Sequence, residues 1–350
     1  MRVLRLSVLF GVTIGVASLA AQTGSRSSAP ATEKRAAAAN KSAMLRTPWG
    51  APDLQGTWDF RTVTPLERPA ELAGKATLTE KEAAEYERRM VEQRNADNRH
   101  DKTPRRTVNG TAETEDVALA YNDFWWDRGT KVVGTRRTSL IVDPPDGRIP
   151  PLTPEGQKRL ADDDALRARV TEGPEDRSIA ERCIMGFNAG PPMTPGGYNQ
   201  NVQIVQHADY VVLLNEMIHN ARIIPLDDRP RSNVPQWAGE SRGRWEGDAL
   251  VIDTRNFHQN TSLRGSSPTM HLVERIKRVD ANSLLYEFTV DDPTTWTKPW
   301  TAQVPMVKSD GLIYEYACHE GNYGMFGILS GARAIENKAR QAAVKSGSPR

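Results

Sequence analysis

The stretch that decides the fold runs from Met270 to Val290 and reads MHLVERIKRV-DAN-SLLYEFTV. In its second half, every other residue is large and apolar: Leu284, Tyr286, Phe288 and Val290. Side chains of an extended strand point to alternate faces, so this pattern predicts a strand with one buried face and one wetter face. The turn-forming residues DAN separate this strand from a second one over 270–279. Together the two runs predict an antiparallel hairpin.

The same alternation of short apolar runs and turn residues continues on both sides of this hairpin. The expected strands are 202–206, 210–217, 221–226, 242–246, 249–254, 270–279, 283–290, 300–306 and 312–318. Their connections are of hairpin size and none has room for a long helix, which excludes parallel crossovers. The sequence therefore predicts a mainly β fold, an antiparallel meander that closes into a barrel or a curved sandwich.

The first half of the chain adds helices and loops to the edge of this sheet. A first strand is expected over 53–60. The stretch 79–95 begins with the capping box Thr-Glu-Lys-Glu, which predicts a surface helix. The stretch 153–170 opens with Thr-Pro, an N-cap followed by proline at the first helical position, and predicts a second helix. Between them, a DPPDG turn predicts a hairpin over 138–152. We expect two or three peripheral helices in all.

The first 20 residues are typical of an export signal. Arg2 and Arg5 precede an uncharged apolar run that ends in small residues, as in a secretory signal peptide. The run is shorter than the about 18–20 apolar residues that a membrane anchor needs. We expect a periplasmic or secreted protein with no membrane anchor after cleavage. The expected organisation is a signal peptide (1–20), a disordered spacer (21–46), one β-rich domain (47–335) and a polar C-terminal tail (336–350).

Charge and composition exclude some classes of protein. The chain of 350 residues holds 46 Lys and Arg against 44 Asp and Glu, a net charge of +2. This balance excludes a strongly basic nucleic-acid binder, because phosphate contacts need a dense positive face. Arg2 and Arg5 account for the whole net charge, so the exported chain is neutral. The net charge of the chain is therefore a feature of the export signal and indicates nothing about the partner of the protein.

The two cysteines, Cys183 and Cys318, allow two interpretations. In an oxidising compartment an isolated pair predicts a disulfide, which we favour. The alternative is metal ligation through Cys318, His319 and Glu320. One thiolate beside these two residues, with no second cysteine nearby, does not have a zinc-site spacing. We predict no metal site and no cofactor.

Two carboxylates, Glu216 and Glu274, fall in phase with the apolar residues of their strands. A buried carboxylate costs several kcal/mol unless Arg, His or a ligand lies beside it. His219, His271 and His319 are near in sequence or at expected strand ends. One interpretation is a set of structural ion pairs and strand-end surface groups. The other is a polar cluster at a barrel mouth that binds a small organic ligand, with Glu216, His219, Glu274 and His319 as the ligand-binding candidates.

Whether the protein is an enzyme stays open. Gly239-Glu240-Ser241-Arg242-Gly243 matches the G-x-S-x-G nucleophile elbow, which needs a strand–turn–helix context. The residues that follow predict a hairpin instead, so a Ser241 hydrolase is an alternative and not the main hypothesis. A second enzymatic alternative is an isomerase or lyase that uses a Glu–His pair, with Glu274 and His271 as catalytic candidates.

The aromatic pair Trp125-Trp126 suggests two further roles. In an extended chain the two rings point to opposite sides, so at most one is buried easily. Such rings usually pack as core or edge covers, and the alternative is a stacking platform for sugars or aromatic ligands. A structural or interaction role at the cell envelope is the remaining hypothesis. It predicts an exposed aromatic patch here and no concave pocket.

Several signatures in the chain resemble those of a known set of proteins. They are PDLQGTW at 52–58, GRWEGDALVIDT at 243–254, HLVER at 271–275, VDDP at 290–293 and TKPW at 297–300. They are similar to the motifs of a large uncharacterised family of secreted proteins from environmental bacteria, in patches over 48–325. This resemblance implies secretion and assigns no catalytic residue. Gly56-Thr57-Trp58 is also similar to the G-x-W opening of lipocalin-type barrels. We therefore expect a secreted, β-barrel-like protein that binds a small organic ligand.

Overall fold

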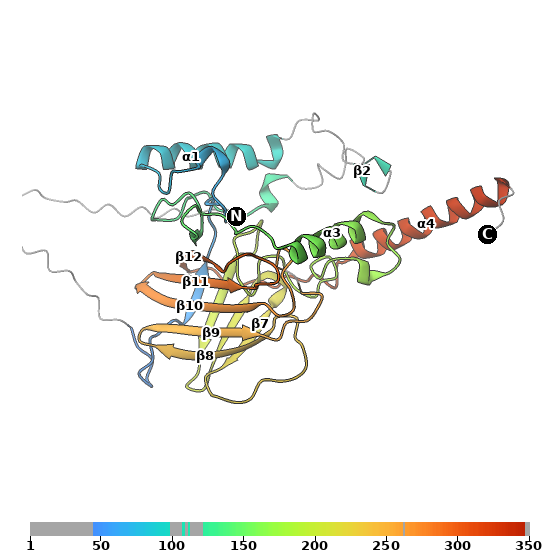
Figure 1. Ribbon diagram of the computed structural model, residues 1–350. Coiled ribbons are helices and arrows are strands. Elements are labelled where there is room, and N and C mark those ends of the chain that lie inside the picture. The colour runs from blue at the N-terminus through green and yellow to red at the C-terminus, as the bar shows by residue number, and fades with distance from the viewer. Residues whose placement is uncertain (1–44, 99–106, 109–110, 113–121, 262, 347–350) are drawn as a thin grey trace, which may run out of the picture. The chain divides into compact units, whose positions relative to one another are not determined.

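The computed structural model of the chain describes residues 45–98, 107–108, 111–112, 122–261 and 263–346 (Figure 1). The expected signal peptide (1–20) and nearly all of the expected spacer (21–46) lie outside the described residues. The strands of the main sheet are β1 (Gly56–Asp59), β4 (Ile141–Asp143), β5 (Asn201–Gln206), β6 (Tyr210–Asn215), β7 (Ala221–Pro225), β8 (Glu240–Glu246), β9 (Ala249–Arg255), β10 (His271–Asp280), β11 (Ser283–Asp291) and β12 (Trp300–Ser309).

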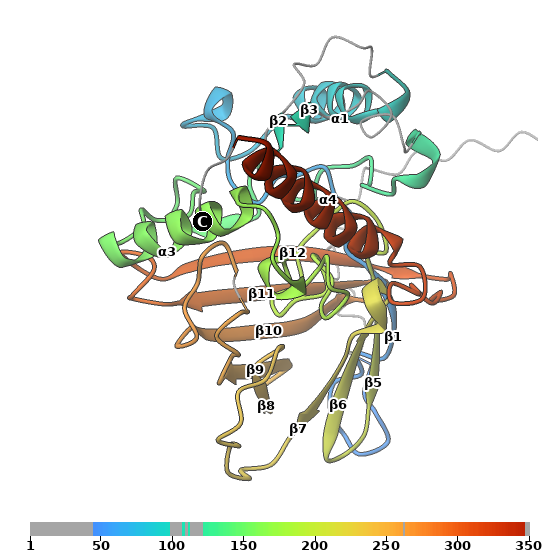
Figure 2. The ribbon, with the colours of Figure 1, turned by 90° about the vertical axis from the view of Figure 1, so that its right-hand side faces the viewer.

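The helices lie outside this sheet. In the described part of the chain they are α1 (Glu80–Arg94), α3 (Pro154–Ala168) and α4 (Tyr323–Ser346). The short elements are the 3₁₀ turns η1 (Ala70–Leu72), η2 (Ala96–Asn98), η3 (Asp123–Trp125), η4 (Pro174–Asp176) and η5 (Met217–His219), and the paired strands β2 (Thr107–Val108) and β3 (Thr111–Ala112). All three helices lie beyond β12, on the side of the sheet away from β8 (Figures 1 and 2).

The ten strands form one antiparallel sheet in the order β7-β6-β5-β1-β12-β11-β10-β9-β8, with β4 also on β12. Figure 2 shows β10–β12 crossing the direction of β5–β7, so the sheet is strongly curved. Its edge strands β7 and β8 come close without forming a ladder. Gly243 of β8 permits this approach, because a Cβ there would lie 2.7 Å from Leu226 and 2.9 Å from Ile224. The predicted mainly β, antiparallel fold is confirmed, as an open curved sheet and not a closed barrel.

The expected strand 312–318 is wrong. β12 pairs with β11 along one edge, and its other edge is taken by β4 at its start and by β1 at its end. A strand that follows β12 through the Ser309-Asp310-Gly311 turn has no free edge to join. The chain therefore leaves the sheet and reaches Cys318, which forms the predicted disulfide with Cys183, with a Cα–Cα distance of 5.6 Å.

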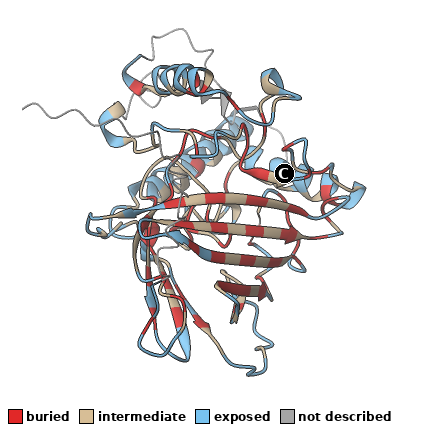
Figure 3. Cartoon of the chain, turned by 90° about the vertical axis from the view of Figure 1, so that its left-hand side faces the viewer, coloured by how far each residue is buried: buried red, intermediate tan, exposed pale blue. Residues whose placement is uncertain are grey.

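The interior of the sheet is filled with side chains. Buried and partly exposed residues alternate along β10–β12 (Figure 3). The predicted face of β11 is confirmed, since Leu284, Tyr286, Phe288 and Val290 are all fully buried. Trp58, Trp300 and Phe60 occupy the same core. The hydrophobic effect of burying these large rings holds the curved sheet together.

The alternation in 210–216 predicts that Tyr210, Val212 and Leu214 face the interior together with Glu216, and this prediction is wrong for the three strand residues. Val211, Leu213 and Asn215 are the buried residues of β6, while Tyr210 is exposed. Both faces of this strand carry apolar side chains, so periodicity alone does not tell them apart. Glu216 is nevertheless buried, at the position between the end of β6 and the start of η5.

The predicted N-terminal capping residues of the two helices are confirmed. Thr79 forms the predicted capping box with Glu82 and starts α1, and Thr153 accepts from the Gly156 amide at the start of α3.

The hairpin expected over 138–152 is wrong: β4 pairs with β12, and the chain after the turn pairs at Leu152 with Trp296. The polar C-terminal residues expected as a tail from 336 continue α4 as far as Ser346.

Candidate functional site

Glu274 lies on the interior face of β10 and is fully buried. Arg222 reaches it from β7 and donates from Nη1 to Oε2 at 2.7 Å and from Nη2 to Oε1 at 2.8 Å. Burial works to lower the pKa of Arg222, but the charge and hydrogen bonds of Glu274 outweigh it and hold that pKa above its ordinary value. The partner that a buried carboxylate requires is thus an arginine, and Glu274 is part of a structural ion pair.

Tyr286 connects this ion pair to a surface loop. Its hydroxyl donates to Oε1 of Glu274 at 2.7 Å and accepts from the backbone N–H of Met193 at 3.1 Å. Burial, and then the charge of Glu274, raise the pKa of Tyr286 well above its usual value, so the phenol keeps its proton. Met193 is fully buried within the Gly/Pro-rich loop 190–197. The interior ion pair therefore anchors this loop.

The structure does not bring the other predicted ligand-binding residues to Glu274. Glu216 accepts from Nδ2 of Asn201 at 2.9 Å and from the backbone N–H of Tyr314 at 3.3 Å. It fastens the segment after β12 to the end of β6. His219 and His319 are exposed, and within the described residues their side chains bond to neither carboxylate.

His271 and Ser241 also lie apart from Glu274. His271 is half-buried on the outer face of the sheet, with Nε2 2.6 Å from Oδ2 of Asp253. Burial opposes the effect, but this contact and nearby arginines lower the pKa of Asp253. Ser241 is buried within β8, and its Oγ lies 2.9 Å from Oγ1 of the cross-strand Thr254. A residue inside a strand lacks the strand–turn–helix geometry of a nucleophile elbow.

A cavity of about 970 Å³ opens at the end of the sheet from which β5 and β10 start. Leu140 and Met270, which belong to the hydrophobic core, form its floor. The loop 185–197 borders it, with Pro191, Pro192 and Phe187 among the lining residues. This volume lies within the range of small-molecule pockets, about 300–1,000 Å³.

Trp126 and Arg128 form one wall of this cavity. The guanidinium of Arg128 lies 3.6 Å from the centroid of the Trp126 ring, and its Nη1 donates to the carbonyl of Arg94 at 2.8 Å. Arg94 is the last residue of α1. A Cβ at Gly197 would come within 2.8 Å of the Trp126 ring, so a glycine there lets the loop lie close against the wall.

Hydrogen bonds from two elements hold this wall in place. Glu87 of α1 accepts from the backbone N–H of Val132 at 3.0 Å and from Nζ of Lys131 at 2.8 Å. Thr64, which follows β1, accepts from the backbone N–H of Val133 at 3.0 Å. Two of the three bonds use the backbone, so the segment that carries Trp126 and Arg128 has a defined path between α1 and the sheet.

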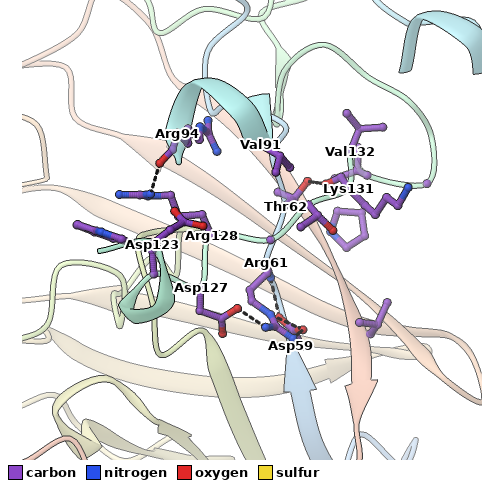
Figure 4. Close-up of a pocket in the computed structure, with 17 residues that line it drawn as sticks. Asp59, Arg61, Thr62, Val91, Arg94, Asp123, Asp127, Arg128, Lys131 and Val132 are labelled. Atoms are coloured by element: carbon purple, nitrogen blue, oxygen red, sulfur yellow. Dashed lines mark hydrogen bonds and ion pairs between the residues drawn. The ribbon is translucent and has the colours of Figure 1, made fainter. Parts of the chain in front are cut away.

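A second cavity, of about 490 Å³, lies against the same wall and shares Thr62, Arg94, Trp126 and Arg128 with the larger one (Figure 4). Here Arg61 lies between Asp59 and Asp127 and pairs with both. The hydrogen bond to Asp59 outweighs partial burial and, with Asp127, raises the pKa of Arg61. In this smaller cavity, Arg61 thus forms ion pairs with Asp59 and Asp127.

Sequence reasoning found only part of this site. It indicated that at most one ring of Trp125-Trp126 is buried, which is confirmed: Trp125 is 61% exposed and Trp126 is half-buried. It missed Arg94 and Arg128. Arg128 follows the aromatic run by two residues, and Arg94 ends the predicted helix, but neither position carries a local signal of a cavity.

Comparison of the chain with protein-family models, with curated proteins and with solved structures gives no match. The class is therefore defined by its architecture: a mainly β protein with an open, curved antiparallel sheet and a cavity at one end. Among the described residues, no three His, Cys, Asp or Glu side chains gather as a metal site needs. No helix in that part of the chain has both the length and the apolar character needed to cross a bilayer.

Proposed function

We propose that this protein binds a small organic molecule in the 970 Å³ cavity at the end of the sheet. The observation that carries the proposal is the composition of that cavity. Its floor is apolar core, at Leu140 and Met270, and its wall carries an aromatic ring and arginines, at Trp126, Arg94 and Arg128. Ligand pockets combine a mostly apolar lining with a few fixed polar groups in this way.

We further propose that binding takes place in the periplasm or outside the cell. The support is the signal-peptide pattern of residues 1–20 and the disulfide between Cys183 and Cys318, which is typical of an oxidising compartment. The signatures similar to those of secreted bacterial proteins, such as GRWEGDALVIDT, point the same way.

The alternatives have less support. Ser241 bonds to Thr254, and Glu274 bonds to Arg222 and Tyr286, so neither is arranged as a catalytic group. The interaction hypothesis expects an exposed aromatic patch without a concave pocket. Phe124 and Trp125 are 83% and 61% exposed, but they occur together with the cavity, so this pair does not favour interaction over ligand binding.

The test uses Nile red, an uncharged apolar probe, with the chain that begins after residue 20. We expect saturable fluorescence enhancement with one site per chain. Ala180 is a small, half-buried lining residue, and Ala180→Trp fills part of the cavity. We expect this variant to weaken Nile red binding at least tenfold, because the indole takes the volume that the probe needs.

The matched control is Ala165→Trp, which adds the same indole on the exposed face of α3. It should bind Nile red like the unchanged protein. Circular dichroism and urea unfolding check that both variants are folded. No saturable binding, or equal binding by the Ala180 and Ala165 variants, would contradict the proposed function.

A further inference from the structure

In the described part of the chain, the charged side chains that line the 970 Å³ cavity are all basic. Among the described residues, three arginines line it, Arg94, Arg128 and Arg264, and no Asp or Glu does. Arg264 pairs with Glu67 at 3.4 Å, outside the lining. Basic and acidic side chains nearly balance over the whole chain. The described lining is therefore more basic than the chain as a whole, and a basic lining attracts an anion.

Arg94 is the arginine best placed to bind that anion. It is half-buried at the end of α1, and within the described residues its guanidinium has no hydrogen-bond acceptor, while its carbonyl accepts from Arg128. The nearby carboxylate of Asp123 lines only the smaller cavity and accepts from the backbone N–H of Ala96 at 3.1 Å. A planar guanidinium matches a carboxylate through two parallel hydrogen bonds.

The rest of the lining favours an aromatic body. Trp126 lies close against Gly197, and the guanidinium of Arg128 stacks on its ring. Phe187, also a lining residue, packs edge-on against Tyr198. The ring centroid of Tyr198 in turn lies 5.8 Å from that of Trp126. Rigid ring faces next to an apolar floor suit a flat ligand, which they contact with little loss of conformational entropy.

We propose, on the basis of the proposed function, that the ligand is an aromatic carboxylate. Its carboxylate pairs with Arg94, and its ring lies on the apolar floor formed by Leu140 and Met270, beside Trp126. Arg128 helps indirectly, because it stacks on Trp126 and holds the carbonyl end of α1.

The experiment compares two probes of the same shape, 2-naphthoate and the neutral 2-naphthamide, by isothermal titration calorimetry. We expect naphthoate to bind at least tenfold more tightly, since a charge-assisted bond to a half-buried arginine is lost in the amide. Arg94→Met should remove this difference. Arg88→Met is the control: Arg88 is an exposed residue of the same helix and does not line the cavity.

Each outcome decides the inference. A preference for naphthoate that disappears in Arg94→Met and persists in Arg88→Met supports it. Equal affinity for the two probes, a preference that survives Arg94→Met, or no binding of either probe overturns it. The proposed function is judged separately by the neutral Nile red, so an aromatic-acid inference that fails leaves a cavity that still binds Nile red.

Discussion

The ion pair of Arg222 and Glu274 shows how a buried charge is accommodated at a single residue. Glu274 is fully buried, and its carboxylate accepts from Arg222 and Tyr286. The low dielectric of the interior makes each charge costly alone and their attraction strong. The pair also reaches the cavity loop through Tyr286 and Met193.

Removing one partner should therefore be more harmful than removing both. We expect Glu274→Gln to lower the free energy of unfolding by about 3–5 kcal/mol, because the charge of Arg222 is left buried without a counter-ion. The double variant Arg222→Met with Glu274→Met should recover most of this loss, since two apolar chains fill similar volume. Urea unfolding followed by tryptophan fluorescence measures both. A double variant less stable than the single one would contradict this account.

At the same scale, the sequence indicated that Glu274 is buried and needs a partner, but not which residue provides it. Leu272 and Ile276 place Glu274 in the apolar phase of its own strand. Arg222 is 52 positions away, and the register of β7 against β6 turns it inward opposite Leu213. Only the curvature of the sheet brings the two side chains together.

Among the elements, α4 is fastened by few contacts. The disulfide joins Cys318, just before α4, to Cys183. Asn322 donates to the carbonyl of Glu181 at 2.9 Å, and Arg333 donates to the carbonyl of Thr171 at 2.8 Å. Ala332 is the single buried residue among the described side chains of the helix. The position of α4 thus depends on a covalent bond more than on apolar burial.

Loss of the disulfide should loosen this part of the chain first. We expect the double variant Cys183→Ser with Cys318→Ser to lose about 2–5 kcal/mol of stability, because closing a loop of this length restricts the unfolded chain. Limited proteolysis should then cut near residues 310–322 before it cuts the sheet. The unchanged protein treated with reductant is the control and should behave alike. Unaltered stability and cleavage would show that the disulfide does not constrain the fold.

Over the whole molecule, several carboxylates with depressed pKa values stabilise the folded state. Asp292 is an example: it accepts from the backbone N–H of Ser267 at 2.6 Å and from the Thr295 hydroxyl at 2.7 Å. Burial alone would raise its pKa, but these bonds outweigh it and lower that pKa. Such a group contributes stability above its unfolded pKa, about 3.9, and this stability is lost as the pH falls through the folded value.

We therefore expect the free energy of unfolding to fall as the pH drops below about 4. Asp292→Asn should lower stability at pH 7 by about 2 kcal/mol and make the decrease below pH 4 less steep. Urea unfolding at a series of pH values measures both effects. The control is Asp228→Asn. Asp228 is exposed and forms no hydrogen bond or ion pair within the described residues, so this variant should change neither the stability at pH 7 nor the decrease below pH 4. A parallel pH profile for the unchanged protein and Asp292→Asn would contradict this assignment.

The sequence by itself determined the features that depend on near neighbours. Strand alternation identified the buried face of β11, and capping residues marked the starts of α1 and α3. These signals act over a few residues, so they can be detected without knowing the fold. The expectation for 312–318 failed because the edge it needed is taken by β1 and β4, which lie far earlier in the chain.

The tertiary structure alone decided where a ligand could bind. The interior expected to open at a barrel mouth is filled by Trp58, Trp300 and Tyr286. The cavity lies outside that core, between the end of α1, the wall at Trp126 and the loop 185–197. A cavity exists where surfaces from separate parts of the chain leave space unfilled. No short stretch of sequence predicts such a cavity, because its shape depends on how several distant segments pack against one another.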